Sequence, residues 1–178
     1  MMGELAYKIC IFGETGVGKT TLARRFLKGY FEENIKVTMG AEIHVKYLKI
    51  DETRIVLQVW DFGGESMFNF LLPLYSKGSS GGIFMFDLSR YETIERADKW
   101  LGCFKQGISS EIKDIPILLV GGKLDLEDQI AISQKEAESI AQRYNMFNYI
   151  ESSSKTGKNV EMIFEVLLKR ILKDYKLI

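Results

Sequence analysis

The sequence has no excess of charge of either sign, few cysteines and no long apolar run. Its 24 basic and 24 acidic residues give a formal net charge of zero, so bulk electrostatics do not favour nucleic acid as a partner. Two scattered cysteines, Cys10 and Cys103, are too few for a disulfide framework, and we interpret both as reduced thiols. No apolar run approaches the roughly 18 residues of a membrane-spanning helix.

The chain also lacks recognisable targeting or lipid-attachment signals. Its first residues do not show the charged-then-apolar pattern of a signal peptide. Its last residues, KDYKLI, include no cysteine for a prenyl group. The single histidine, His44, has no evident cluster of metal-binding residue types around it, so we interpret it as structural. We therefore expect a monomeric cytoplasmic protein without a membrane anchor of its own.

The sequence does contain alternating strand-like and helix-like patterns within one expected domain of 178 residues, which predicts an α/β layered fold. Strand patterns occupy 9–12, 42–48, 54–61, 83–88, 117–120 and 147–150, and helical patterns occupy 22–27, 94–108, 137–144 and 160–171. The short turn at 51–53 predicts an antiparallel hairpin. Two stretches, 29–40 and 62–78, are irregular, and the second has room for a short helix.

Helix ends carry their own signals. Ser89-x-x-Glu92 and Ser133-x-x-Glu136 predict capping boxes at two helix starts. Basic residues gather late in the last helical pattern, where they suit the helix dipole. The alternative for this last helix is a basic face turned toward a membrane.

The residues from Gly13 to Thr20, GETGVGKT, fit the phosphate-loop pattern of a glycine, four residues and Gly-Lys-Thr. A strand pattern leads into them and a helical pattern leads out. Gly13 and Gly18 allow the backbone to wrap a phosphate, and the loop amides point inward at a helix N-terminus. Lys19 is placed to reach the β- and γ-phosphates, and the Thr20 hydroxyl to bind Mg²⁺.

Two further stretches supply candidates for the metal and the terminal phosphate. Asp61 ends a strand pattern and begins the Asp-x-x-Gly sequence that finishes at Gly64. A carboxylate there can hold Mg²⁺, often through water, while the Gly64 amide can approach a γ-phosphate closely. Thr38 can complete the Mg²⁺ shell only when a γ-phosphate is present, which would make its loop a switch. The alternative is that Thr38 is a solvated threonine.

The sequence after the fifth strand pattern, Gly121-Gly122-Lys123-Leu124-Asp125, indicates guanine rather than adenine. The Asp125 carboxylate can accept two hydrogen bonds from guanine N1–H and N2–H₂, a donor pair that adenine lacks. The aliphatic stem of Lys123 can lie over the base. Ser152-Ser153-Ser154-Lys155 follows the last strand pattern, where backbone amides can meet the guanine O6 and Lys155 can cover the ring.

In this order, the motifs resemble those of the Ras superfamily of small GTPases over nearly the whole chain. The stretch Thr38-Met39-Gly40-Ala41-Glu42-Ile43, together with Trp60 and Phe68, is most similar to the Rab branch. The resemblance implies a GTPase domain over residues 1–178, with a six-stranded mixed sheet and five helices on both faces. It also implies a GDP/GTP switch whose effectors, exchange factors and activating proteins bind through two segments, from Thr38 to Ile43 and from Phe62 to Tyr75.

The resemblance assigns roles to individual residues. Mg²⁺ is expected on Thr20, Thr38 and Asp61, and catalysis is expected to use Glu65, Lys19 and Gly64. Phe31 is expected to pack edge-on against the guanine. The residues expected to bind GDP or GTP are Glu14, Thr15, Gly16, Val17, Gly18, Lys19, Thr20, Thr21, Phe31, Thr38, Gly64, Lys123, Asp125, Ser153, Ser154 and Lys155.

The sequence departs from the family pattern in four places. Glu65 stands where the family has its switch II glutamine, which bears on hydrolysis. Gly122 replaces the asparagine of the family's Asn-Lys-x-Asp motif, which bears on affinity. Ser153-Ser154-Lys155 is a mild variant of the family's Ser-Ala-Lys. The prenylated tail of Rabs does not appear in this sequence, which bears on membrane anchoring.

Three functions are compatible with these residues. The first is a switch that binds GDP and GTP with Mg²⁺ and slowly hydrolyses GTP, as a regulator of signalling or trafficking. The second is a nucleotide-binding pseudo-GTPase scaffold with little or no hydrolysis, which Glu65 and Gly122 favour. The third, an ATP-using phosphate-loop kinase, is disfavoured by Asp125 and by the scattering of the basic residues, which leaves no arginine-rich lid.

Overall fold

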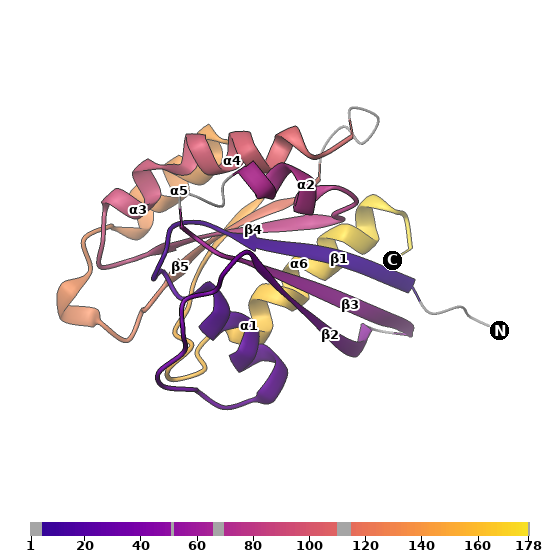
Figure 1. The fold of residues 1–178 in the computed structure, drawn as a ribbon, viewed down its shortest axis with the longest axis horizontal. Coiled ribbons are helices and arrows are strands. Elements are labelled where there is room, and N and C mark those ends of the chain that lie inside the picture. Colours follow the sequence, from indigo (N-terminus) through magenta and orange to yellow (C-terminus); the bar gives the residue numbers. More distant parts are fainter. Residues whose placement is uncertain (1–4, 51, 66–69, 110–114, 178) are drawn as a thin grey trace.

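Six strands form one mixed sheet in the order β2-β3-β1-β4-β5-β6 (Figure 1). The computed structural model describes residues 5–50, 52–65, 70–109 and 115–177. The strands are β1 (Leu5–Phe12), β2 (Ala41–Ile50), β3 (Thr53–Phe62), β4 (Gly81–Asp87), β5 (Ile117–Gly122) and β6 (Asn148–Glu151). The helices are α1 (Lys19–Lys28), α2 (Leu72–Ser76), α3 (Glu92–Glu95), α4 (Ala97–Gln106), α5 (Gln134–Arg143) and α6 (Val160–Asp174), with a 3₁₀ turn, η2, at Glu127–Gln129. The expected α/β fold is confirmed, and the third of its five expected helices is divided at Arg96 into α3 and α4.

Five of the strands run parallel, and this shared direction brings the loops that follow them together. β1 pairs in parallel with β3 and β4, β4 with β5, and β5 with β6. β2 joins β3 as the expected antiparallel hairpin, with Glu42 opposite Asp61. The loops after β1, β3, β4, β5 and β6 therefore meet at one end of the sheet, on the left in Figure 1. In open α/β sheets, ligands bind at this carboxyl edge.

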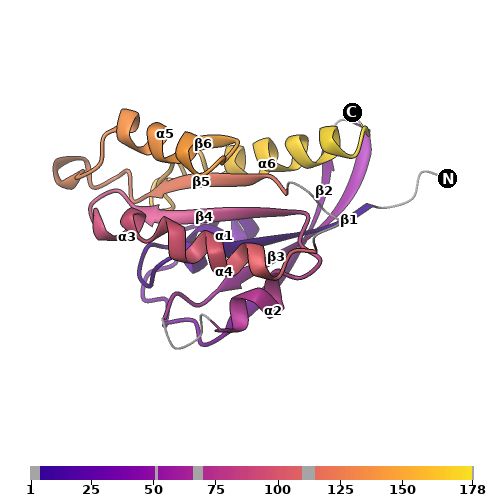
Figure 2. The same cartoon turned by 90° about the horizontal axis from the view of Figure 1, so that it is seen from above.

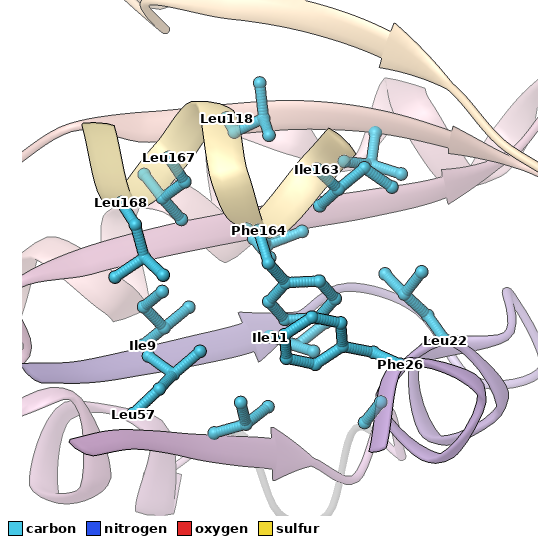
Figure 3. Close-up of a cluster of buried hydrophobic side chains, with 14 of the residues drawn as sticks. Ile9, Ile11, Leu22, Phe26, Leu57, Leu118, Ile163, Phe164, Leu167 and Leu168 are labelled. Atoms are coloured by element: carbon cyan, nitrogen blue, oxygen red, sulfur yellow. The ribbon is translucent and has the colours of Figure 1, made fainter. Parts of the chain in front are cut away.

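Helices cover both faces of the sheet, and each face has its own apolar layer. α1 and α6 lie on one face, and α2 to α5 lie on the other (Figures 1 and 2). On the first face the apolar stripe of α6 packs against α1 and the sheet, where the rings of Phe26 and Phe164 stack with centroids 3.7 Å apart (Figure 3). On the second face Phe12 stacks on Phe104 with centroids 4.5 Å apart.

The burial of α6 confirms the interpretation that this helix packs on the sheet. Its apolar residues, including Leu167 and Leu168, are fully buried in the core of the domain. The helix therefore packs on the sheet and does not offer this stripe to a membrane. Among the described residues, no helix is both long and apolar enough to cross a membrane.

The two expected capping boxes have different outcomes. At α5 the Ser133 side chain accepts from the Glu136 amide, and the Glu136 side chain accepts from the Ser133 amide, so this prediction is confirmed. The box at Ser89 is wrong, because α3 begins at Glu92 without a side-chain cap. The amide and the hydroxyl of Ser89 instead both donate to Oδ1 of Asp87, at 2.9 and 2.7 Å. Hydrogen bonds to a charged acceptor are the stronger ones, and here they hold Ser89 in the loop.

Candidate functional site

The loop between β1 and α1 lines a cleft at the carboxyl edge of the sheet. Gly18 precedes α1 with φ of 102°, a left-handed conformation that favours glycine. α1 begins at Lys19, whose Nζ donates to the carbonyl oxygens of Gly13 at 2.9 Å and Glu14 at 2.7 Å. A Cβ at Gly13 would lie 2.1 Å from the carbonyl oxygen of Met85. The loop can therefore lie this close to β4 only with glycine at position 13.

The cleft surrounds the buried ammonium group of Lys19 with backbone and hydroxyl groups. It has a volume of about 470 Å³ and is lined by Thr15, Gly16, Gly18, Lys19, Thr20, Thr21, Ile35, Lys36, Val37, Thr38, Phe62, Gly63, Gly64, Arg90 and Lys123. Burial lowers the pKa of the Lys19 ammonium to about 8, although the carboxylates of Asp61 and Glu14 oppose this shift. Lys19 thus remains mostly charged at neutral pH. A helix N-terminus, a glycine-rich backbone and a lysine around one cleft suit a phosphate group.

Three side-chain oxygens from α1, the next loop and β3 meet at this cleft. Thr20 Oγ1 donates to Oδ2 of Asp61 at 2.5 Å and lies 2.7 Å from Oγ1 of Thr38. Burial raises the pKa of Asp61 to about 6, against the hydrogen bond from Thr20 and the charge of Lys19. Within the described residues, Oδ1 of Asp61 is buried without a hydrogen-bond partner. Mg²⁺ prefers oxygen ligands, so the three expected metal ligands fit this ion, and a bound ion would give the unpartnered oxygen an electrostatic partner.

The loop that carries Thr38 and the segment after β3 touch each other and the phosphate loop. The Gly63 amide donates to the carbonyl oxygen of Gly40 at 2.7 Å. A Cβ at Gly63 would lie 2.4 Å from the Thr38 carbonyl oxygen, and a Cβ at Gly64 would lie 2.4 Å from the amide nitrogen of Thr15. Both glycines are therefore required by close backbone contacts. A group bound at the phosphate loop would meet both segments at once.

A second hollow, of about 250 Å³, adjoins the first and shares Gly18, Thr21 and Lys123 with it. Its lining brings together most of the residues expected to bind the base. The full lining is Val17, Gly18, Thr21, Phe31, Met85, Lys123, Asp125, Leu126, Ser154 and Lys155. The joined hollows place an aspartate and an aromatic ring beside the phosphate cleft, which matches the size and polarity of a nucleotide.

Two of the expected residues support the site through their neighbours. Ser153 does not line either hollow, but its Oγ donates to Oδ1 of Asp125 at 2.6 Å and so fixes the carboxylate. The Glu14 side chain turns away from the cleft, where its Oε1 accepts from Nε1 of Trp100 at 2.8 Å and its Oε2 pairs with Arg96 at 3.4 Å. The backbone carbonyl of Glu14, rather than its carboxylate, is the group that meets the buried lysine.

The glycine at position 122 is matched by a methionine on the neighbouring strand. A Cβ at Gly122 would lie 2.4 Å from Cε of Met85 and 3.1 Å from the carbonyl oxygen of Val17. The Met85 thioether thus occupies the space into which the family's asparagine side chain would extend. Sequence reasoning missed Met85, because its position beside Gly122 depends on the pairing of β4 with β5.

Asp87, the last residue of β4, connects the two hollows. Its Oδ2 lies 2.7 Å from Nζ of Lys123 and 2.9 Å from Nε of Arg90. Arg90 also donates from Nη2 to the Thr15 carbonyl oxygen at 3.0 Å. Burial raises the pKa of Asp87, but hydrogen bonds from Lys123, Ser89 and Arg90 more than offset this and leave it below its ordinary value. Sequence reasoning missed both Asp87 and Arg90, although an acidic residue at the end of a buried strand pattern was a usable signal.

The interpretation of His44 as a residue without potential metal-binding neighbours is wrong. Glu42, His44 and Asp61 have ligand atoms within 4.8 Å of one another. Glu42 and His44 are two apart on β2 and so share a face of the sheet, and Asp61 lies opposite Glu42 on β3. Arg24 already pairs with Glu42 at 3.2 Å, and burial lowers the pKa of His44 although Glu42 opposes this. We therefore interpret Glu42 as the partner of Arg24 in an ion pair, with His44 as a neutral neighbour.

Glu65 and Trp60 are expected residues that line neither of the two hollows. Glu65 follows Gly64 and is half-buried, but it does not line either hollow. Phe68 lies outside the described residues. Trp60, the other residue taken as Rab-like, packs beside Tyr75 with ring centroids 5.7 Å apart, and the Lys8 ammonium lies 3.7 Å from its ring centroid.

Comparison with known proteins gives one consistent result. The family model described as "Ras family" matches residues 8–173. Ras-related protein Rab-1 of Theileria parva is 35% identical over 172 residues, which cover 96% of this chain and 76% of that protein. Ras-related protein Rab-12 of Mus musculus is 35% identical over 174 residues, covering 98% and 70% respectively. Ras-related protein RABA4b of Arabidopsis thaliana is 31% identical over 168 residues, covering 94% and 73%.

Proposed function

Because this chain belongs to the Ras family, among the Rab-like small GTPases, we propose that it is a guanine-nucleotide switch that binds GDP and GTP with Mg²⁺ and hydrolyses GTP slowly. The observation that carries the proposal is the joining of the hollow containing Asp125 to the phosphate cleft, through Gly18, Thr21 and Lys123. A base held in one hollow would present its phosphates to the other without a change in the arrangement of the strands.

Guanine is the base that these residues favour. The Asp125 carboxylate, held by the Ser153 hydroxyl, can accept two parallel hydrogen bonds from N1–H and N2–H₂ of guanine. Adenine has no such pair of donors and would leave the carboxylate unsatisfied, which is costly in a partly desolvated hollow. Lys123 is fixed by Asp87 at 2.7 Å, so its aliphatic stem is held in place to cover the ring.

The metal and the terminal phosphate would be sensed by the same side chains. Thr20, Thr38 and Asp61 would hold Mg²⁺, which when bound neutralises phosphate charge. Thr38 belongs to the loop that touches Gly63, so a γ-phosphate that attracts Thr38 also fixes the segment after β3. Loss of this phosphate removes the attraction and frees both segments, as in other order-to-disorder switches.

Slow hydrolysis follows from the residues near the terminal phosphate. Lys19 and the Gly64 amide are placed to stabilise the negative charge of the reacting group. Glu65, at the family's glutamine position, has no amide donor and brings a further negative charge. We expect an intrinsic rate on the order of the 10⁻⁴ s⁻¹ of Ras. The alternative, a nucleotide-binding scaffold that does not hydrolyse GTP, is favoured by the same glutamate.

The test is to purify the protein, identify the nucleotide that it retains, and measure competition among GTP, XTP and ATP. The proposal expects retained GDP or GTP and a strong preference for GTP over ATP. Asp125→Asn should shift this preference toward XTP, whose C2 carbonyl suits an amide donor. Equal binding of ATP and GTP by the parent would contradict the guanine site. A single-turnover assay then separates the switch from the scaffold.

The same segments offer a surface for partner proteins. Apolar side chains on both are exposed, among them Met39 at 81%, Ile43 at 54%, Phe70 at 74% and Leu74 at 65%. Exposed apolar patches of this kind mark interaction sites, and here they lie on the elements that would respond to the γ-phosphate. Hydrogen–deuterium exchange should therefore slow in both segments when GDP is replaced by a non-hydrolysable GTP analogue. Equal exchange in the two states would contradict a switch.

A further inference from the structure

Arg90 is a second cation fixed in the phosphate cleft. It lies in the loop after β4, and its side chain, 37% exposed, is among those that line the cleft. Its Nε pairs with buried Asp87 at 2.9 Å, and its Nη2 donates to the Thr15 carbonyl oxygen at 3.0 Å. Its charge is close enough to contribute to the lowered pKa of Lys19. The cleft thus holds a guanidinium that belongs to the same chain.

The position of Arg90 places it at the end of the cleft where the terminal phosphate would lie. Gly64, whose amide is expected to meet the γ-phosphate, packs against the phosphate loop at Thr15. Arg90 reaches the loop at the same residue, and a Cβ at Gly16 would lie 3.5 Å from its Nη2. Both groups therefore approach the phosphate loop at the same turn.

We propose that Arg90 binds the γ-phosphate of GTP and stabilises its transfer to water, so that the chain carries its own catalytic arginine. This inference rests on the proposed GTP site. In the reaction the water oxygen bonds to the γ-phosphorus, and the bond from that phosphorus to the β–γ bridging oxygen breaks. The bond's electron pair goes to GDP. One proton of the water stays on the oxygen that bonds to phosphorus and the other moves to a γ-oxygen, so that dihydrogen phosphate is released. Charge grows on the bridging and γ-oxygens, where a guanidinium stabilises the transition state.

The contacts of Arg90 favour this role. A phosphate oxygen in place of the neutral Thr15 carbonyl gives a charge-assisted hydrogen bond, which is about twice as strong. Asp87 can keep its bond to Nε while a phosphate oxygen takes the place of the Thr15 carbonyl at Nη2, because the two nitrogens donate in different directions from one planar group. The pair with Asp87 also restricts the side chain beforehand, so that little rotamer freedom is lost when the phosphate binds.

The test compares single-turnover GTP hydrolysis, GDP affinity and trapping of GDP with aluminium fluoride, a mimic of the transition state. Arg90→Gln removes the charge and keeps a polar group near Asp87, and Arg90→Lys keeps the charge without the planar fork. The matched control is Arg170→Ala, because Arg170 makes a similar pair with Asp174 at 3.0 Å on α6, outside the cleft. GDP affinity is measured first, since a parent that binds no guanine nucleotide would contradict the proposed function itself.

The parent should trap GDP with aluminium fluoride without any added protein, and Arg90→Gln should not. Arg90→Gln should lower the hydrolysis rate by about 10²-fold, the usual cost of losing one preorganised donor, while its GDP affinity stays close to that of the parent. Arg90→Lys should fall between them, and Arg170→Ala should match the parent. A parent-like rate for Arg90→Gln would overturn the proposal. Equal losses of rate and GDP affinity would also overturn it, since they would show that Arg90 only braces the phosphate loop.

Discussion

Nζ of Lys123 lies 2.7 Å from Oδ2 of Asp87, although Asp87 ends β4 and Lys123 follows β5. The same carboxylate holds Arg90 at 2.9 Å. One buried acid thus positions Lys123, which lines both hollows, and Arg90, which lines the phosphate cleft. Any change at Asp87 should therefore be felt in both hollows.

Asp87→Asn should destabilise the fold by about 2 kcal/mol at pH 7, the typical worth of hydrogen bonds to a charged group. The pKa of Asp87 is below its ordinary value in the folded protein. Its carboxylate therefore contributes stability above the unfolded pKa of about 3.9, and this contribution is lost as the pH falls through the folded value. Urea unfolding at pH 7 and pH 3 should show a smaller difference between parent and variant at pH 3. Asp174→Asn, which removes an exposed pair, is the control and should have little effect at either pH. A difference that does not change with pH would show that the charge of Asp87 is unimportant.

The pair of Met85 and Gly122 should behave as a unit in nucleotide binding. Gly122→Asn alone forces the Met85 methyl group to move, because a Cβ at position 122 would lie 2.4 Å from Cε. Met85→Ala removes that obstacle, so the double variant should bind GDP about tenfold more tightly than the parent through one or two regained hydrogen bonds. A double-mutant cycle on GDP affinity measures the coupling. Additive effects would show that the methionine does not occupy the space of the missing side chain.

Lys19→Ala should weaken GTP binding by about 10- to 100-fold, since it removes a charge-assisted contact to the phosphates. Isothermal titration with GTP in Mg²⁺ would measure this. Lys49→Ala, at an exposed pair with Glu52 on the hairpin, is the control and should bind like the parent. GTP affinity that survives the loss of Lys19 would argue against phosphate binding in the cleft.

Glu65→Gln should hydrolyse GTP faster than the parent, because the amide supplies a donor toward the phosphoryl oxygens and removes a negative charge. Glu65→Ala should be close to the parent, since glutamate contributes little in our interpretation. Single-turnover rates from pH 6 to 8 provide the comparison. A parent rate far above that of Glu65→Ala would instead show that Glu65 acts as an effective general base.

The fold and the outline of the site could be predicted from the sequence because their signals are local. Buried strands such as β4 and β5 are continuous apolar or glycine runs, and the phosphate loop fits a pattern of eight consecutive residues. The six-stranded mixed sheet then follows from the resemblance to a known family. Phe31, Asp125 and Lys155, which were expected to bind the base, do line one hollow.

The missed features depend on neighbours that are distant in sequence. Ser89 has a capping pattern, but Asp87 offers its hydroxyl and its amide a charged acceptor instead. Met85 fills the space beside Gly122 only because β4 and β5 are adjacent. Arg90 enters the cleft only because the loops after β1 and β4 meet at the same edge, where it contacts Thr15. Single-sequence patterns contain no information about such pairings.

The stacking of Phe26 on Phe164 has a consequence for synthesis of the chain. The helix that follows the phosphate loop is packed against the last helix, which leaves the ribosome more than a hundred residues later. Until α6 emerges, the apolar faces of α1, β1 and β3 lack their cover, and a nascent chain that exposes such faces is prone to aggregate. We expect chaperones to hold this nascent chain until α6 emerges. Stable retention of a nucleotide should begin only after that point, when residues up to Leu172 can complete the core.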